Sequence, residues 1–226
     1  MAVYAASDWH GHFWIWEKVK NILQPEDRLY FLGDAADRGP DGWFLIKALL
    51  NDFRVTYIKG NHDQMLCDRH FRNTSYDVED IHNYNGGRHT WRQFLIDTDP
   101  HKESYITKLD HCSYFATYLN KNHQNVFMSH SGSINTRENY QLIWDRSHFY
   151  NPNIKPYDLV VHGHTPNLIL MEELIGEFPD TDEDITSKAT FYCDGKKCDI
   201  DAGTHFTNQA YLFNLNTFES ELITND

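Results

Sequence analysis

The sequence predicts an α/β protein whose sheet is connected by parallel crossovers. The observation that supports this class is the alternation of strand and helix patterns over the first sixty residues. A strand-helix-strand order implies right-handed crossovers between parallel strands. With 226 residues, 40% of them hydrophobic, the chain can bury a sizeable core. We therefore expect residues 1–226 to form a single domain.

The N-terminal elements follow in order from the spacing of their apolar residues. Residues 2–7 are a short apolar run that predicts a buried strand, and residues 13–23 have helical spacing. Residues 28–34 predict a second buried strand. Pro40 opens a second helix, because a proline at the first turn gives up an N–H that would have no helical partner. Residues 54–63 predict a third strand that runs into a loop.

The middle of the chain interrupts this alternation. Residues 64–121 are polar and rich in histidine, and they include a stretch with helical character at 103–122. We expect a helical, loop-rich insertion over one end of the sheet. Strands resume at 125–130 and 158–164, and the C-terminal part favours antiparallel hairpins. The acidic segment 172–188 is expected to be a mobile loop.

Charge and composition exclude some classes of protein. A net charge of −13 argues against a surface devoted to nucleic acid or membrane. No run approaches the roughly 18 apolar residues that span a bilayer. The N-terminus lacks the charged and apolar regions of a signal peptide, so a cytoplasmic location is expected. The four cysteines are mostly far apart, and we expect them to be reduced thiols.

Five segments carry reactive side chains, and each follows the C-terminal end of a predicted strand. They are SDWHGH with Asp8 and His10, GDAADRG with Asp34, Asp37 and Arg38, GNHD with Asn61 and His62, SHSG with His130, and HGHTP with His164. Ligands bind at this edge of an open α/β sheet because the loops converge there. The sequence therefore predicts that these side chains form one site.

The residue types suit a site for two metal ions. Asp8 and His10 can turn toward one ion, and Asp34 can place one oxygen on each of two ions about 3.5–4 Å apart. The second ion's shell would be completed by Asn61, His130 and His164. Oxygen and imidazole ligands suit Mn, Fe or Zn, and no thiolate is in the set. Two divalent ions would leave the pocket positive, which suits an anion such as phosphate.

The other side chains of these segments have roles in such a site. Arg38 offers a planar fork that matches two phosphate oxygens. His62 can donate a proton to the leaving group as a general acid, and Asp37 can hydrogen-bond its other ring nitrogen. Arg146, in LIWDR, is a second candidate phosphate clamp.

In this order the motifs D-x-H-G, G-D-x-x-D-R-G, G-N-H-D and G-H-T-P resemble those of the calcineurin-like metallophosphoesterases, most closely the phosphoprotein phosphatase branch. NGG at 85–87 and IWDR at 143–146 are similar to the bacterial and bacteriophage lambda-type Ser/Thr protein phosphatases. The resemblance covers the chain from Asp8 to about Gly203. It implies two mixed β-sheets packed as a sandwich and flanked by helices.

The resemblance also implies a mechanism and a role for each residue. A hydroxide bridging two metal ions would attack phosphorus in line, without a phosphoenzyme, and Mn would be the usual metal, with Fe and Zn in other members. The implied sets are Asp8, His10 and Asp34 for the first metal; Asp34, Asn61, His130 and His164 for the second; His62 with Asp37 as the acid pair; and Arg38 and Arg146 as phosphate clamps.

Several functions stay open at this point. The leading hypothesis is a metal-dependent phosphatase acting on phosphoserine or phosphothreonine in proteins, or on a small phosphoester. A diadenosine tetraphosphate hydrolase or a broad phosphodiesterase is the alternative, since Asp63 replaces the glutamate of many protein phosphatases. Pro166, in place of the second histidine of G-H-x-H, disfavours general diesterases and nucleases. An inactive binding module would not need a general acid.

Each residue also has a purely structural interpretation. The first three motifs alone could be turn and cap residues, but their order argues against this. His130 and His164 could be satisfied core histidines, and Arg146 could be an arginine on a helix surface. We expect His162 to be packed rather than a ligand. The remaining histidines of interest are expected to be surface or insertion residues: His12, His70, His82, His89, His101, His111 and His123.

Overall fold

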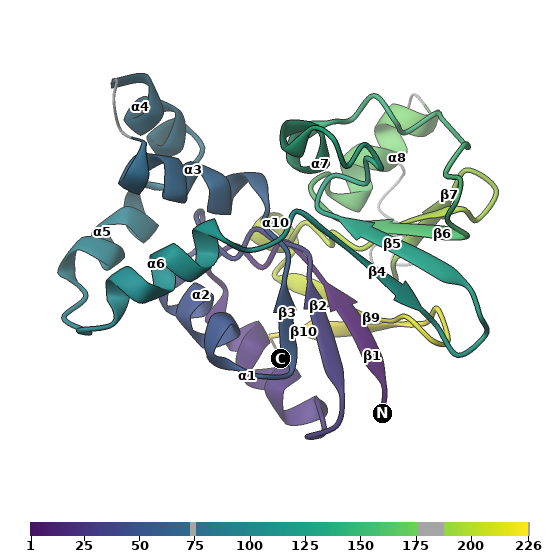
Figure 1. Ribbon diagram of the computed structural model, residues 1–226, viewed down its shortest axis with the longest axis horizontal. Coiled ribbons are helices and arrows are strands. Elements are labelled where there is room, and N and C mark those ends of the chain that lie inside the picture. Colours follow the sequence, from purple (N-terminus) through teal and green to yellow (C-terminus); the bar gives the residue numbers. More distant parts are fainter. Residues whose placement is uncertain (73–75, 176–187, 226) are drawn as a thin grey trace.

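The computed structural model describes residues 1–72, 76–175 and 188–225 of the chain. It confirms the α/β class and the sandwich of two mixed sheets, each with five strands (Figure 1). The first sheet has the order β10-β9-β1-β2-β3, in which β1, β2 and β3 are parallel and β9 and β10 form an antiparallel hairpin. Its strands are β1 (Val3–Ala6), β2 (Arg28–Phe31), β3 (Val55–Tyr57), β9 (Gln209–Asn214) and β10 (Ser220–Thr224).

The second sheet has the order β4-β5-β6-β8-β7, with β5, β6 and β8 parallel and the two outer strands antiparallel to their neighbours. Its strands are β4 (Phe115–Leu119), β5 (Asn125–Ser129), β6 (Leu159–His162), β7 (Thr190–Tyr192) and β8 (Lys197–Asp199). The two expected C-terminal hairpins, β7–β8 and β9–β10, are therefore confirmed, and they belong to different sheets.

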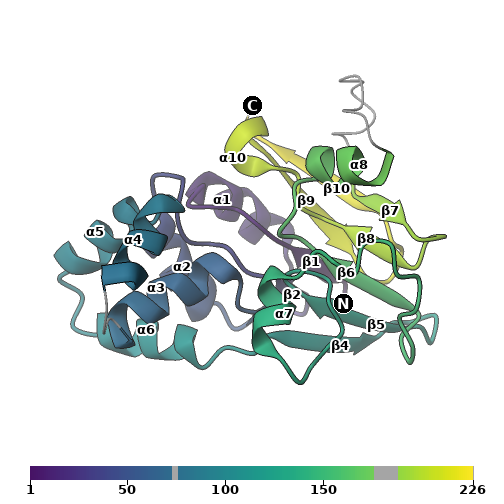
Figure 2. The same ribbon diagram turned by 90° about the horizontal axis from the view of Figure 1, so that it is seen from above.

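The helices lie on the outer faces of the sandwich and at one end of it. α1 (Phe13–Ile22) and α2 (Gly42–Asn51) cover the first sheet, while α7 (Asn139–Trp144) and α8 (Asn167–Ile175) lie over the second (Figure 1). Four helices, which lie between β3 and β4 in the sequence, gather at one end of the sandwich, as the view in Figure 2 shows. They are α3 (Asn61–Phe71), α4 (Tyr76–Tyr84), α5 (Arg88–Ile96) and α6 (Lys102–Asp110), and α10 (Thr204–Thr207) is a single turn near the site.

Alternating side chains of each strand fill two different cores. In β1, Ala5 faces the apolar core between the sheets, while Ala6 faces the core under α1 and α2. In β9, Phe213 and Leu212 divide in the same way, as the two-residue period of a strand requires. Both cores share the strands of the first sheet, so we propose that the chain forms a single domain.

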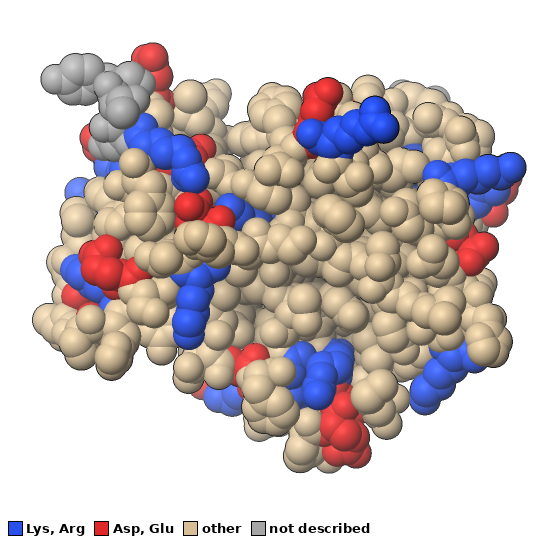
Figure 3. Space-filling model, in the orientation of Figure 1, with Lys and Arg blue, Asp and Glu red and all other residues tan. Residues whose placement is uncertain are grey.

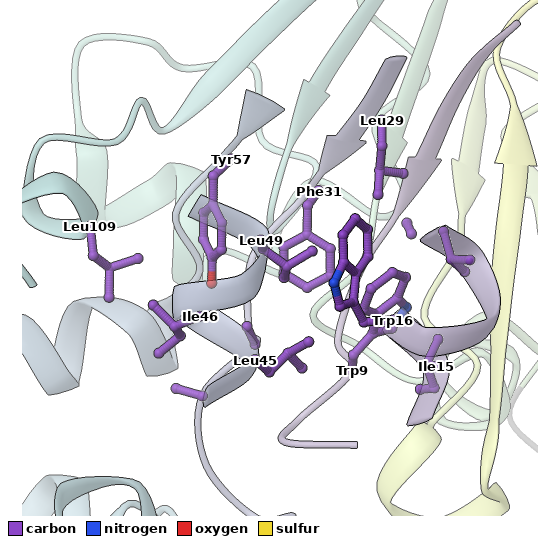
Figure 4. Close-up of a cluster of buried hydrophobic side chains, with 14 of the residues drawn as sticks. Trp9, Ile15, Trp16, Leu29, Phe31, Leu45, Ile46, Leu49, Tyr57 and Leu109 are labelled. Carbon is purple, nitrogen blue, oxygen red and sulfur yellow. The ribbon is translucent and has the colours of Figure 1, made fainter. Parts of the chain in front are cut away.

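The core under α1 and α2 is rich in aromatic rings. Trp9 is fully buried and packs edge-on against Phe31 at 4.9 Å, and Trp16 of α1 lies beside it (Figure 4). An aromatic pair of this geometry contributes about 0.5–1.5 kcal/mol beyond the burial of its area. Because Trp9 stands between Asp8 and His10, this packing fixes the backbone that carries both of these site candidates.

The expected insertion is helical, but its C-terminal limit is wrong. Residues 103–122 are not one helical stretch: α6 ends at Asp110, and Phe115–Leu119 forms strand β4. The alternating side chains of this segment pair with β5, and the ring of Phe115 stacks on Phe127 at 5.5 Å. Pairing with a neighbouring strand therefore decides the structure of a segment whose local pattern also fits a helix.

The first residues of the expected acidic loop at 172–188 are helical instead. Residues up to Ile175 belong to α8, and 176–187 lie outside the described residues. Within the described ranges, no helix combines the length and the apolar character that crossing a bilayer requires.

A hydrogen-bonded histidine ties the loop after α7 to the second sheet. The His148 ring donates from Nε2 to the Ser131 carbonyl at 2.6 Å, and its Nδ1 accepts from the Lys197 ammonium at 3.1 Å. Lys197 also donates to the His148 carbonyl. Burial lowers the pKa of His148 to about 4, and the charge of Lys197 adds to this effect. The loop that carries Arg146 is thus held by an imidazole that must stay neutral.

This histidine predicts a specific dependence of stability on pH. The unfolded chain binds a proton at His148 near pH 6.5 and the folded chain only near pH 4, so stability is lost as pH falls between these values. Between pH 7 and pH 5, wild type should lose about 2 kcal/mol more unfolding free energy than His148→Gln, which cannot titrate. Urea unfolding of both proteins at the two pH values measures this. Equal losses would contradict it.

Candidate metal centre and active site

The five reactive segments all follow strands, and they meet at one edge of the sandwich. Asp8 follows β1, Asp34 follows β2 and Asn61 follows β3, all in the first sheet. His130 and His164 follow β5 and β6 of the second sheet. The convergence that the sequence predicts is therefore observed, and both sheets contribute side chains to the site.

The backbone of these segments is unusual. Six of their non-glycine residues have positive φ angles: Asp8 (58°), His10 (40°), Asp34 (60°), Asp37 (70°), Arg38 (63°) and His164 (71°). Such conformations cost of order 1–3 kcal/mol each and persist only when the surroundings impose them. Here the left-handed turns bring consecutive polar side chains to the same side of the chain, where they can face a common centre.

Asp34 lies at the middle of the cluster. Its Oδ2 is 3.3 Å from His130 Nε2 and 3.8 Å from His10 Nε2. The Oδ1 atom of Asp8 is likewise 3.8 Å from His10 Nε2. Two groups of potential ligands result, and both contain Asp34, with all ligand atoms of each group within 4.8 Å of one another. The groups are His10, Asp34 and His62, and Asp8, Asp34 and His130.

Asn61 and His164 extend the second group. The Asn61 side-chain carbonyl lies 2.9 Å from His130 Nε2 and 3.0 Å from His164 Nδ1. The backbone N–H of His164 donates to Asp8 Oδ2 at 2.9 Å. All six residues predicted as metal ligands are thus within one connected cluster. The geometry places His62 beside His10 and Asp34 as well, so proximity alone does not separate a ligand from a general acid.

The histidine rings are oriented as metal ligands would be. His10 Nδ1 is 2.9 Å from the Ala36 carbonyl, and His130 Nδ1 is 2.8 Å from the Leu32 carbonyl. A carbonyl can only accept, so each Nδ1 carries a proton, and in the neutral ring the Nε2 lone pair is then the one available to a cation at the centre. This arrangement, in which a backbone carbonyl fixes the tautomer, is typical of metal-binding histidines.

The charges of the cluster also favour cations. Burial would lower the pKa of the His130 imidazole, but Asp34 and Asp8 outweigh burial and raise it to about 10. Burial would raise the pKa of Asp34, yet His130 and His62 hold it well below its usual value. The carboxylates therefore draw positive charge into a buried space. The donor set, its orientation and its charge all fit the two divalent ions that the sequence predicts.

Asp63 is a residue of the site that sequence reasoning missed. It is fully buried at the first turn of α3, where its Oδ2 accepts the backbone N–H groups of Gly60 at 3.0 Å and Asp34 at 2.8 Å. This cap explains why GNHD begins a helix rather than the loop expected from the sequence. Gly60 itself must lack a side chain, because a Cβ there would lie 2.1 Å from Asp34 Oδ1.

His62 and Asp37 form the pair expected for a general acid. His62 Nδ1 lies 2.9 Å from Asp37 Oδ2. Burial would raise the pKa of Asp37, but hydrogen bonds from His62 and His82 lower it to about 2, so Asp37 is ionised and accepts from both rings. The exposed Arg38 spans the opening, with Nη1 2.9 Å from His10 Nε2 and Nη2 3.0 Å from His62 Nε2.

Arg146 lies near the part of the site formed by His164. It follows α7, is exposed, and is close enough to act on His164, whose pKa is lowered by burial, by His130 and also by Arg146. The Trp144 ring stands edge-on to His164 at 6.0 Å and stacks on Tyr140 at 6.2 Å. Two arginines thus flank the cluster, and two aromatic rings line one side.

Two histidines outside the motifs need comment. His162 is buried, and its Nε2 is 2.7 Å from the Tyr192 hydroxyl, so it is packed as expected. His82 was grouped with surface or insertion residues; it lies in the insertion, but it is fully buried and its Nε2 is 3.1 Å from Asp37 Oδ1. Its position three residues before NGG is the only sequence signal that could have indicated this contact.

Comparisons with known proteins agree with this arrangement. The model of the calcineurin-like phosphoesterase family matches residues 1–168. No curated protein gives a significant sequence match. Similar solved structures include a candidate diadenosine tetraphosphatase, with 15% identity, a TM-score of 0.61, and coverage of 98% of this chain and 92% of that one.

Two further structures are similar. A metallophosphoesterase from Sphaerobacter thermophilus has 17% identity and a TM-score of 0.58, covering 99% of this chain and 88% of that one. A protein serine/threonine phosphatase from Saccharomyces cerevisiae has 14% identity and a TM-score of 0.57, with coverage of 100% and 80%. At these identities the likeness concerns the fold. The family match extends over most of the chain, and the chain therefore belongs to the calcineurin-like phosphoesterase family.

Proposed function

We propose that this protein is a phosphatase that depends on two metal ions and hydrolyses phosphomonoesters, most specifically phosphoserine and phosphothreonine in proteins. One observation carries the proposal: two groups of candidate metal ligands share Asp34, and His62 of the first group also pairs with Asp37 and contacts Arg38. Ligands alone would fit a structural metal site. An acid pair and a phosphate clamp at the same centre fit the cleavage of a phosphate ester.

Two divalent ions at this centre would activate a hydroxide for direct attack on phosphorus and would neutralise the phosphate charge. The proposed ligands are those predicted from the sequence: Asp8, His10, Asp34, Asn61, His130 and His164. They offer oxygen and imidazole nitrogen, a set that suits Mn and also Fe or Zn. We propose Mn as the working metal.

The protein's own groups complete the reaction. Arg38 leaves its contacts with His10 and His62 and binds two phosphate oxygens with its planar fork. This exchange frees the lone pair of His62 Nε2, which takes up a proton from solvent and then delivers it to the leaving oxygen. Asp37 stabilises the protonated imidazole through Nδ1. Arg146, exposed near His164, is the second phosphate clamp in this proposal.

The preference for monoesters rests on composition and on the second position after His164. Pro166 removes a polar group that a diesterase could use on the second ester arm. On the face in Figure 3, coloured Lys and Arg side chains are scattered among Asp and Glu, without one continuous basic surface. That distribution, with a net charge of −13, disfavours a nuclease. We keep a cytoplasmic location as a prediction of the sequence.

A second candidate is hydrolysis of a dinucleoside polyphosphate such as diadenosine tetraphosphate. The observation in its favour is the Tyr140–Trp144 stack beside His164, because Tyr140 is 70% exposed and could support a nucleobase. A binding module without activity would use the fold but has no need of the His62–Asp37 pair.

Metal removal tests the reaction class. Purified protein loaded with Mn should hydrolyse p-nitrophenyl phosphate, and EDTA should abolish turnover until Mn is added again. Asp34→Asn should bind fewer than two ions per chain by elemental analysis, because Asp34 belongs to both groups. Asp194→Asn, an exposed change on the β7–β8 turn, is the matched control. Absence of turnover with Mn, Fe and Zn in turn would contradict the proposal.

The general acid is tested by His62→Asn. Turnover of phenyl phosphate, whose leaving group needs a proton, should fall about 10²–10⁴-fold while two metal ions stay bound, because the change removes the proton donor and no essential ligand. His123→Asn is the control: His123 is an exposed residue with positive φ, a conformation that asparagine tolerates. If His62→Asn loses an ion, His62 is a ligand and the assignment of roles is wrong.

The substrate class is decided by direct competition. One Mn-loaded sample is tested with a phosphoserine peptide, diadenosine tetraphosphate and a bis-ester, and kcat/KM is compared. The proposal expects the phosphopeptide to be preferred by at least about tenfold, a difference of about 1.4 kcal/mol. Preference for diadenosine tetraphosphate, together with its loss in Trp144→Ala, would establish the second candidate instead.

A further inference from the structure

The Asp37 carboxylate has two imidazole partners, and only one of them belongs to the proposed acid pair. His62 Nδ1 is 2.9 Å from Oδ2, and His82 Nε2 is 3.1 Å from Oδ1. All three side chains are almost fully buried, so water does not compete for these bonds. The ionised carboxylate can only accept, and each histidine therefore donates to one of its oxygens.

The His82 ring packs against the NGG motif at Gly87. A Cβ at Gly87 would lie 2.0 Å from His82 Nε2, a distance that no real side chain could occupy. Gly87 has a φ of −75°, which any residue adopts, so the ring and not the backbone requires glycine here. The Gly87 N–H also donates to the His82 carbonyl at 2.8 Å. The motif is thus explained by a contact with the acid pair.

The same segment holds the loop that carries Asp37. The Asp37 N–H donates to Thr90 Oγ1 at 2.9 Å, and the Arg38 N–H donates to the Gly86 carbonyl at 3.4 Å. Asp37 and Arg38 both have positive φ angles, and such conformations need neighbours that impose them. Among the described residues of this segment, His82 is the one that contacts the carboxylate itself.

A carboxylate bonded at one oxygen can rotate about its Cβ–Cγ bond, and the bonded ring would move with it. Bonds to both oxygens, from rings on α3 and α4, fix the carboxylate plane. The position of His62 Nε2, the atom that faces the leaving group, then depends on both partners. At metal sites, removing a hydrogen-bond donor that orients another functional side chain typically lowers activity by about 10–100-fold.

We propose that His82 is a positioning residue for the general acid, forming the chain His82–Asp37–His62 that aims His62 Nε2 at the leaving oxygen. The proposal rests on the proposed phosphatase activity, and it assigns to the helical insertion a part in proton delivery.

The test compares leaving groups. A phenolate of high pKa needs the proton of a general acid, whereas p-nitrophenolate leaves more easily without it. In His82→Ala, kcat on phenyl phosphate should fall about 10-fold or more, while kcat on p-nitrophenyl phosphate falls less than about 3-fold. KM should stay within about twofold on both. His82→Gln, which can place an amide N–H near the position of Nε2, should recover most of the loss.

A second variant guards against a folding defect. Gly87→Ala displaces the ring without removing it, and it should give the same difference between the two substrates. Thermal unfolding and metal content are measured for each variant. Equal losses on both substrates would show that His82 only supports the fold, and unchanged kinetics would show that it does not position His62. Either result overturns the proposal.

One measurement separates this proposal from the proposed function. In metal-free protein with ¹⁵N-labelled histidine, the ring signals of His62 and His82 are recorded before and after His82→Ala. The change should shift the His62 Nδ1 signal, because the shared carboxylate loses a partner. An unchanged His62 signal overturns the chain of contacts even if the enzyme is active. If the wild-type protein hydrolyses neither phenyl phosphate nor p-nitrophenyl phosphate, the proposed function is wrong. The ring signals of His62 and His82 still test the contacts with Asp37 in that case.

Discussion

The buried carboxylate of Asp34 is the interaction on which the arrangement depends. It belongs to both groups of ligands, it accepts the His62 backbone N–H at 3.0 Å, and its own N–H is held by Asp63. A buried charge is costly unless it is paired, so the residues around Asp34 must supply hydrogen bonds and opposite charge to its carboxylate. The partners come from both sheets: Asn61 follows a strand of the first and His130 one of the second. The distance between them is therefore set by the apolar core between the sheets.

This dependence links stability and chemistry. The apolar residues between the sheets, such as Ala5 and Val161, bring the strand ends together, and the strand ends present like charges and strained turns. Divalent ions would remove the repulsion between Asp8 and Asp34, so ligand binding and folding favour the same packing. The left-handed turns at Asp8, Asp34 and His164 are tolerated because the packing behind them, including Trp9, is tight.

Much of this could be predicted from the sequence, for a physical reason. Parallel strands of one sheet end at the same edge, so the motifs after β1, β2 and β3 must converge, and the order of the residue types indicates two metals. That the motifs after β5 and β6 join them depends on how the two sheets pack. What local pattern could not predict depends on partners distant in sequence. Phe115–Leu119 becomes a strand because β5 lies beside it, Asn61 begins a helix because Asp63 caps it, and His82 is buried because Asp37 needs a second donor.

The surroundings of Asp37 are one part that the sequence left open, and they suggest a division of labour. The proposed metal ligands lie in the loops that follow the strands and in the first turn of α3. The side of the site around Asp37 is instead closed by α4 and α5, through His82, Gly86 and Thr90. A change in these helices would leave the ligands in place and alter how the proton and the phosphate clamp are presented. The helical insertion is therefore where one metal centre can be fitted to different leaving groups, since the leaving group is the part of the ester that the metals do not hold.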